Sequence, residues 1–266
     1  MTSDNSISLS ADSPAESSEI GLEQQIRFKS EDGQLLLLLP PEVDAPEATA
    51  NPVWNDIWLQ INQRLNAGEK FWQPETIVHL IAHNRLLDAR QLQEIHDALA
   101  EAQLRLKRVS TSRRQTAVAA ATAGYSVEQQ SSGNHLSQSA SEVGQALADP
   151  LYLQTTVRSG VEIRHPGSVI VVGDTNPGSS IVAEGDILVW GRLRGVAHAG
   201  AKGNSRCLIM ALQMEPTQIR IAGFVARPPE PPTEIFPEVA YVATDGIRLT
   251  KAASFSRNLL TLQPKR

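Results

Sequence analysis

The chain has a single cysteine, no long apolar run and no cluster of basic residues. Cys207 alone cannot form an internal disulfide or build a structural zinc site, so we expect a reducing compartment. The leucine run at residues 35–39 has five residues, far short of the roughly 20 that a membrane-spanning helix needs. The N-terminus also lacks a basic segment followed by an apolar one, so no signal peptide is predicted.

The charge balance excludes some classes of partner. A formal net charge of −5 without a basic run argues against nucleic acid, whose binding requires clustered Lys and Arg. The same composition gives no support for direct attachment to acidic lipids, so membrane association has to come through a partner. Only acidic charges precede the first basic residue, Arg27, and residues 1–21 are predicted to be a disordered acidic tail.

Glycines recur at a fixed interval in the second half of the chain. Gly167 and Gly173 enclose five residues, and 18 residues later Gly185 and Gly191 enclose five more. Short β-branched segments between glycines are typical of strands whose corners need positive φ or leave no room for a side chain. A period of 18 divides into three sides of about six residues, which favours a three-sided β-helix, and the next step falls on Gly203.

The first half alternates predicted strands and helices. Helices are predicted from Asn51-Pro52, from Asp88 and from Ser112, and the last of them ends at Gly124. Asp88 and Ser112 each precede a Gln by three residues, which is the spacing of a capping box. Strands are predicted at residues 25–29, 34–39, 76–81, 104–109 and 125–127. This alternation predicts a small α/β domain over residues 22–130.

Composition predicts the remaining boundaries. Residues 131–149 contain five serines, no Lys or Arg and few apolar side chains, and a flexible linker is predicted over residues 131–154. The β-helix is predicted over residues 155–227, and residues 228–266 are predicted to form a Pro-rich spacer with a C-terminal hairpin and tail. Because the linker has little apolar content, we expect the two halves to fold independently and not to dock.

Several segments of the repeat occur in a specific order. They are residues 157–167 (VRSGVEIRHPG), 172–178 (VGDTNPG), 183–203 and 212–222. In this order they resemble the C-terminal domain of the MinC family of septum site-determining proteins, over about residues 155–250. The resemblance implies an all-β, right-handed, three-sided β-helix, and a weaker similarity of the first half implies the other MinC domain. One position departs from the family, which often has Gln where this chain has Val161.

The resemblance also implies a function and partners. It implies a non-enzymatic cell-division inhibitor whose N-terminal domain antagonises polymerisation of the tubulin-like protein FtsZ. The β-helix would form a homodimer and bind the ATPase MinD, which carries the inhibitor to the inner face of the plasma membrane from the cytoplasm. In this family the positions matching Arg158, Ser159 and Gly160 belong to the MinD-binding surface. No cofactor, metal or catalytic residue is implied.

A dimer interface is predicted on one side of the β-helix. Trp190 lies 18 residues after Val172, so the two side chains point to the same side of the repeat. A bulky aromatic residue on a flat sheet suits a dimer face, and the neighbouring Val189 is assigned to it as well. A purely internal position for Trp190 stays open as the alternative.

Other patterns are weighed against ordinary structural roles. His79 and His83 are four residues apart, but no third metal ligand accompanies them, so we interpret them as structural. Residues 200–205 lack the spacing of a phosphate-binding loop and are interpreted as a β-helix corner. The alternative function is a hexapeptide-type acyltransferase, with His165 or His198 as the general base.

Overall fold

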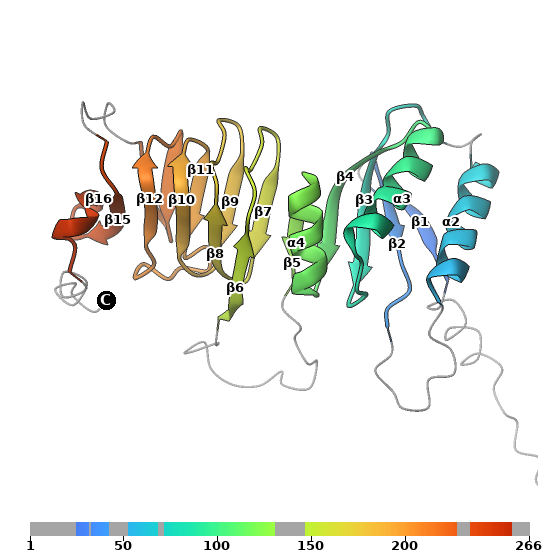
Figure 1. Ribbon diagram of the computed structural model, residues 1–266, viewed down its shortest axis with the longest axis horizontal. Coiled ribbons are helices and arrows are strands. Elements are labelled where there is room, and N and C mark those ends of the chain that lie inside the picture. The colour runs from blue at the N-terminus through green and yellow to red at the C-terminus, as the bar shows by residue number, and fades with distance from the viewer. Residues whose placement is uncertain are drawn as a thin grey trace, which may run out of the picture.

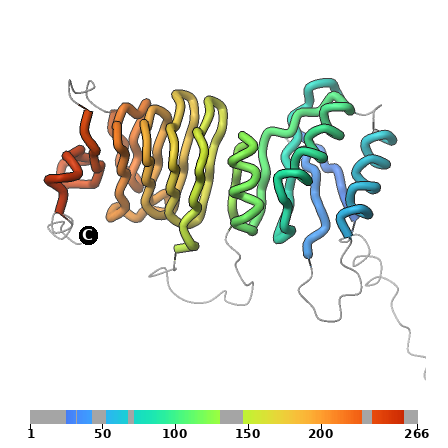
Figure 2. Tube along the Cα trace, in the orientation of Figure 1, coloured from blue at the N-terminus to red at the C-terminus, as the bar shows by residue number. Residues whose placement is uncertain are grey.

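The computed structural model describes residues 25–31, 33–42, 53–68, 72–130, 147–227 and 235–256 (Figure 1). An α/β half, residues 25–130, is followed by a coil region, residues 147–227, in which short strands stack upon one another (Figure 2). A β-hairpin ends the described chain. The predicted acidic tail, the proline-rich spacer and the start of the first helix at Asn51-Pro52 lie outside the described residues.

The α/β half confirms the predicted alternation of strands and helices. Its elements are β1 (Arg27–Glu31), β2 (Gln34–Leu38), α2 (Trp54–Gly68), β3 (Ile77–His83), α3 (Ala89–Glu101), β4 (Arg105–Thr111), α4 (Arg114–Ala123) and β5 (Ser126–Gln129). β1 and β2 form the predicted antiparallel hairpin, and β2, β3, β4 and β5 are parallel neighbours. The helices pack on one face of this sheet and bury its leucine, isoleucine and valine side chains (Figure 1).

Two helix starts were predicted from capping boxes, and one is confirmed. The Asp88 carboxylate accepts a hydrogen bond from the Gln91 backbone N–H at 2.7 Å, and the Gln91 side chain accepts one from the Asp88 backbone. The box at Ser112 is wrong, because α4 has Arg113 as its N-cap and no side-chain cap. The Ser112 hydroxyl instead donates to the carbonyl of His83 at 3.3 Å.

The coil region confirms a predominantly β second half. Its strands are β6 (Ala148–Leu153), β7 (Glu162–His165), β8 (Gly167–Val172), β9 (Ser180–Ala183), β10 (Ile187–Leu193), β11 (Val196–Ala199), β12 (Ile209–Met214), β13 (Gln218–Ile221) and β14 (Phe224–Ala226). β6, β8, β10 and β12 form one parallel stack, and β7, β9, β11 and β13 form a second. Single bridges join Val157 to Thr175 and Thr175 to Leu193 along a third line.

The predicted period of 18 holds for only part of the coil region. Val169 pairs with Ile187, an offset of 187 − 169 = 18, but Ser180 pairs with Val196, an offset of 196 − 180 = 16, and Ile187 pairs with Ile209, an offset of 209 − 187 = 22. The expected step of 18 to Gly203 is therefore wrong. The chain is lengthened between β11 and β12, where nine residues connect the strands, against three between β9 and β10. Gly200 and Gly203, both of which have positive φ, lie in this longer turn.

Glycines lie at coil corners where a side chain has no room, as the sequence predicted. Gly173 has φ +146°, and a Cβ atom there would lie 2.5 Å from the carbonyl oxygen of Thr155 in the preceding coil. A Cβ on Gly191 would in turn overlap the carbonyl of Gly173. Because backbone lies directly against backbone at this corner, no side chain fits there.

The predicted boundaries of the coil region differ from the structure at both ends. β6 begins at Ala148, inside the segment predicted as linker, since it pairs with β8 and buries Leu151 and Leu153. At the other end, β15 (Glu238–Ala243) pairs antiparallel with β12 and is followed by β16 (Gly246–Lys251) and a 3-10 turn, η1 (Ala252–Ser254). The hairpin therefore continues the sheet.

The expectation that the two halves do not dock is wrong. β5 of the α/β half pairs with β7 of the coil region, so a single sheet runs through both halves in the order β1-β2-β3-β4-β5-β7-β9-β11-β13-β14. Pairing between strand edges does not depend on the apolar content of the segment that connects them. Independent folding of each half stays a prediction.

Candidate partner-binding site

The residues 158–160 form an exposed loop immediately before β7. The carbonyl of Arg158 accepts a hydrogen bond from the Val161 backbone N–H at 3.1 Å, which closes a tight turn. Gly160 has φ +80° and donates its N–H to the carbonyl of Gly178 in the next coil at 3.0 Å. Arg158, Ser159 and Gly160 are all exposed, so the fold presents this loop to solvent.

Arg158 differs from the other arginines that the sequence places near it. Arg192 donates to both carboxylate oxygens of Asp174, through its backbone N–H at 2.9 Å and its side-chain Nε at 3.0 Å. Arg194 donates to Asn176 Oδ1 at 2.7 Å and lies 3.6 Å from the same carboxylate. The backbone N–H of Arg192, followed by both guanidinium groups, holds the pKa of Asp174 below its ordinary value. These cations are therefore compensated.

The guanidinium group of Arg158 makes no hydrogen bond or ion pair with any residue that the structure describes. Arg164, the fourth arginine of this region, donates to Glu162 at 2.8 Å. An exposed, uncompensated guanidinium beside a turn with open backbone groups can donate several hydrogen bonds to a carboxylate or carbonyl of another molecule. Val161, which occupies the position where a Gln amide was expected from the family pattern, is buried.

The predicted dimer residues do not all lie on the same face of the sheet formed by β8 and β10. Trp190 is 60% exposed and Val172, on the neighbouring strand, is 36% exposed, and the two are directly opposite each other in the register. Val189 is 1% exposed because its side chain points into the coil interior. Its assignment to the interface is therefore wrong: successive residues of a strand point to opposite faces, so neighbours in sequence cannot share this surface.

A ladder of apolar side chains continues the surface around Trp190. Tyr152 in β6, Ile170 in β8, Leu188 in β10 and Met210 in β12 are partners in register across the four strands. None of these four is buried, and Tyr152 is 47% exposed. We call these four residues, with Val172 and Trp190, the apolar outer face. Sequence reasoning missed the ladder, although the 18-residue spacing of residues 152, 170 and 188 could have revealed it.

Two histidines of the coil region were candidates for a general base. No group of three or more His, Cys, Asp or Glu side chains that could hold a metal occurs among the described residues, and the structural interpretation of His79 and His83 stays a prediction. His165 is 3% exposed and its ring contacts Gln129 Oε1 at 3.1 Å and the carbonyl of Asp149 at 2.9 Å. Burial is the main cause that lowers the pKa of His165 and of His198.

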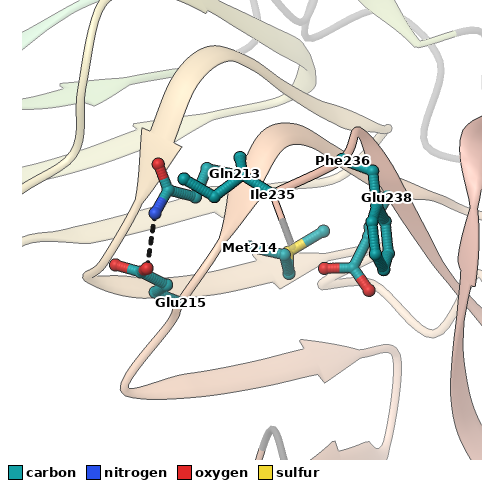
Figure 3. A pocket seen from close by; sticks show the side chains of 6 residues that line it. All are labelled: Gln213, Met214, Glu215, Ile235, Phe236 and Glu238. Atoms are coloured by element: carbon teal, nitrogen blue, oxygen red, sulfur yellow. Dashed lines mark hydrogen bonds between the residues drawn. The ribbon is translucent and has the colours of Figure 1, made fainter. Parts of the chain in front are cut away.

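The coil region has a shallow groove on one sheet and a small hollow near its end. The groove, of about 440 Å³, crosses β7, β9, β11 and β13 and is lined by side chains that include Arg164, His198 and Arg220. The small hollow, of about 10 Å³, lies between the end of β12 and the segment before β15, where Gln213 donates to Glu215 and Phe236 lies beside Glu238 (Figure 3). The latter has room for about one water molecule.

Comparison with known proteins assigns the coil region to a family. Residues 151–252 match the family described as "Septum formation inhibitor MinC, C-terminal domain". Three proteins described as probable septum site-determining protein MinC are close in sequence. The Nostoc protein is 56% identical over 238 residues, which is 89% of this chain and 64% of that protein. The Gloeobacter violaceus protein is 52% identical over 237 residues, 89% of this chain and 82% of its own length.

The third protein, from Thermosynechococcus vestitus, is 50% identical over 225 residues, 85% of this chain and 81% of that protein. The chain belongs to the MinC family. It spans 64% of the length of the Nostoc relative, and these alignments include the α/β half as well as the coil region. Among solved structures, a chain of the "MinC:MinD cell division protein complex" from Aquifex aeolicus is 35% identical, with 43% of this chain and 95% of that chain covered and a TM-score of 0.38.

For this MinC family member, none of the helices in the described part of the chain has the length and apolar character to cross a membrane.

Proposed function

We propose that this chain is a cell-division inhibitor that is brought to the membrane by the ATPase MinD and antagonises FtsZ assembly away from midcell. The observation that carries the proposal is the Arg158-Ser159-Gly160 loop: it matches the family's MinD-binding motif and presents an exposed, uncompensated guanidinium group. The chain would thus be cytoplasmic and associate with the membrane through its partner. We assign it no enzymatic activity, metal or cofactor.

The coil region supplies the scaffold for this role. Its two parallel stacks and third line of bridges fit a three-sided, right-handed β-helix, which is the finer description we propose. The apolar outer face would be covered by the same face of a second copy in a two-fold homodimer, because contiguous apolar surface of this kind is rarely left in water. Trp190 and Val172 would lie in this interface.

The experiment that tests the MinD assignment compares Arg158→Ala with the unchanged chain on MinD-coated liposomes. Loss of a buried charge-assisted contact costs about 2–5 kcal/mol, or tens- to thousands-fold in affinity. We expect Arg158→Ala to lose recruitment while staying folded and dimeric. Arg206→Ala, which removes another exposed arginine of the coil region, is the control and should bind as the unchanged chain does. Undiminished binding by folded Arg158→Ala would remove the loop from the site.

The homodimer is tested by placing a charge on the apolar outer face. Trp190→Asp should shift the sedimentation coefficient from dimer to monomer at a protein concentration of about 10 μM, since a buried unpaired carboxylate is strongly unfavourable. Val225→Asp, on the exposed strand β14 of the other sheet, is the matched control and should remain dimeric. A monomeric unchanged chain at that concentration would rule out this interface.

FtsZ antagonism is tested by co-sedimentation with FtsZ polymers. We expect the full chain to reduce the amount of pelleted FtsZ, and we assign this activity to the α/β half.

The acyltransferase alternative requires binding of an acyl-CoA with His165 or His198 as base. We favour the inhibitor, because His165 is buried and both of its ring nitrogens are engaged, one with Gln129 and one with the carbonyl of Asp149. Calorimetric titration with acetyl-CoA should give no heat of binding.

A further inference from the structure

The line where β5 meets β7 is the place where the two halves of the chain touch. Val127 pairs with Ile163 and Glu128 with Arg164 in parallel register. Val127 and Ile163 are each 1% exposed and belong to a single apolar core that runs through both halves. We call this contact, together with the side chains that bridge it, the seam.

Charged side chains bridge the seam on the face away from the helices. Arg108 of β4 donates to Glu162 of β7 at 2.8 Å and lies 3.4 Å from Glu128 of β5. The side chains of Arg108 and Glu162 are 27% and 24% exposed, so water screens this pair less than an open surface pair. Ser126 contributes a further bond, because its hydroxyl accepts the backbone N–H of Glu162 at 3.0 Å.

A second set of contacts joins the halves on the helical face. α4 packs against β6, and Arg114 of this helix lies 3.3 Å from Asp149. One ring nitrogen of His165 contacts Gln129 of β5 across the seam, while the other contacts the carbonyl of Asp149 within the coil region. The seam therefore has polar contacts on both faces and apolar contacts between them.

Strand edges explain why such a contact is favourable. Without the seam, β5 would be the free edge of the α/β sheet, and β7 would be the free edge of the second stack of the coil region. An exposed edge leaves backbone N–H and C=O groups unpaired and invites pairing with other chains. The seam covers both edges at once, and the Arg108–Glu162 pair gives the pairing a specific partner and register.

We propose that the β7 edge of the coil region is a docking site for the chain's own α/β half, and that the seam holds the halves together without help from the intervening segment. The 158–160 loop precedes Glu162 by only two residues, so docking places the α/β half at a fixed position beside the loop. This proposal depends on the strand pairing and is independent of which protein the loop binds.

The first test cuts the chain after it has folded. A protease site is inserted within residues 131–146, the purified full chain is cleaved, and the products are separated by size-exclusion chromatography at about 1 μM, well below the concentration at which weak contacts persist. We expect the two fragments to elute together. Arg108→Glu should make them elute separately, because Glu162 and Glu128 then face a third carboxylate, and adding Glu162→Arg should restore co-elution.

The matched control is Arg105→Glu, which changes an exposed arginine of the same strand whose ion pair with Glu75 stays within the α/β half. Its fragments should co-elute like those of the unchanged chain. Fragments of the unchanged chain that separate, with each fragment folded by circular dichroism, would overturn the proposal. So would Arg108→Glu fragments that still elute together.

The second test identifies the occupant of the β7 edge. In a Cys207→Ser background, Glu128→Cys and Arg164→Cys place two thiols directly across the seam, and mild oxidation should cross-link them within one chain. Glu128→Cys with Arg220→Cys is the control, since four strand spacings separate them. Disulfide-linked dimers in place of the internal cross-link would show that a second copy fills this edge, which would overturn docking within the chain; absence of any cross-link would overturn it too.

Discussion

The α/β half and the coil region bury apolar side chains in different ways. In the α/β half, large side chains such as Leu37, Leu80 and Leu99 fill the space between the sheet and its helices, and all three are fully buried. In the coil region the interior is enclosed by strands alone, and small or β-branched residues such as Val169 and Ala197 are buried there beside a few leucines such as Leu151.

This difference predicts which kind of core substitution destabilises each half most. In the α/β half, truncating a large buried side chain leaves a cavity, whereas in the coil region the stacked strands are fixed by hydrogen bonds to the coils before and after them and cannot move apart for a larger side chain. The α/β half is therefore expected to be most sensitive to loss of volume, and the coil region to gain of volume. Four predictions test this comparison.

The largest effect is expected from a cavity in the α/β half. Leu99→Ala removes a fully buried side chain of α3 and should lower the free energy of unfolding by about 2–5 kcal/mol. Urea denaturation followed by circular dichroism measures the change. Leu86→Ala, at a position that is 51% exposed, is the control and should change stability by less than about 0.5 kcal/mol. Equal losses for both would contradict the layered core.

An enlarged side chain in the coil interior should have the next largest effect. Ala197 of β11 is fully buried between neighbouring strands, so Ala197→Leu should cost about 1–3 kcal/mol by overpacking. Val182→Leu, on the outer side of the adjacent β9, adds volume toward solvent and should be nearly neutral. If Ala197→Leu left the urea midpoint unchanged, the interior of the coil region would be wider than its strands indicate.

Helix caps give a smaller effect that occurs only in the α/β half. Asp88→Ala removes the hydrogen bond that the carboxylate accepts from the Gln91 backbone N–H and should cost about 1 kcal/mol in thermal or urea denaturation. Ser112→Ala removes a hydroxyl that caps no helix and should cost less than about 0.5 kcal/mol. A larger loss for Ser112→Ala than for Asp88→Ala would reverse the assignment of the two helix starts.

The smallest change is expected on mild acidification, and both halves contribute to it. Burial is the main cause that lowers the pKa of His79 and His83 in one half and of His165 and His198 in the other. Below the ordinary histidine pKa of about 6.5, the unfolded chain binds more protons than the folded chain, so stability falls as pH decreases through that value. Above it, these histidines leave stability unchanged.

Urea midpoints at pH 7.5, 6.5 and 5.5 measure this dependence. His165→Gln should make the decline shallower, since this ring is buried near the like charge of Arg114, although Glu184 and the Asp149 carbonyl partly favour its protonated form. A urea midpoint that rises as the pH is lowered would contradict this prediction, because it would show that the folded chain binds protons more tightly than the unfolded chain.

Local patterns in the sequence were sufficient for much of the fold. The hairpin of β1 and β2, the capped start at Asp88 and the left-handed Gly124 at the end of α4 depend on residues close together in the chain. The paired glycines of the repeat also predicted the first stacked coils. The exposed 158–160 loop could be located by its motif, because a turn before a strand is a local feature.

Features that depend on distant contacts were missed or wrong. The assignment of Val189 to the dimer interface ignored the alternation of a strand. The apolar outer face was missed because its residues come from four strands, although three of them recur at the 18-residue spacing. The change of period at Gly200 was hidden because the sequence does not show how many residues a corner can accommodate.

The sequence by itself determined most strands and helices of the α/β half, the corners of the first coils and the loop that carries the Arg-Ser-Gly motif, since propensity, glycine spacing and capping act over a few residues. Only the tertiary structure decided that the two halves share one sheet. The seam depends on the pairing of β5 with β7 and on the ion pair between Arg108 and Glu162, which are 54 positions apart in the chain. No local pattern specifies which of several strand edges will pair, because every edge offers the same backbone donors and acceptors.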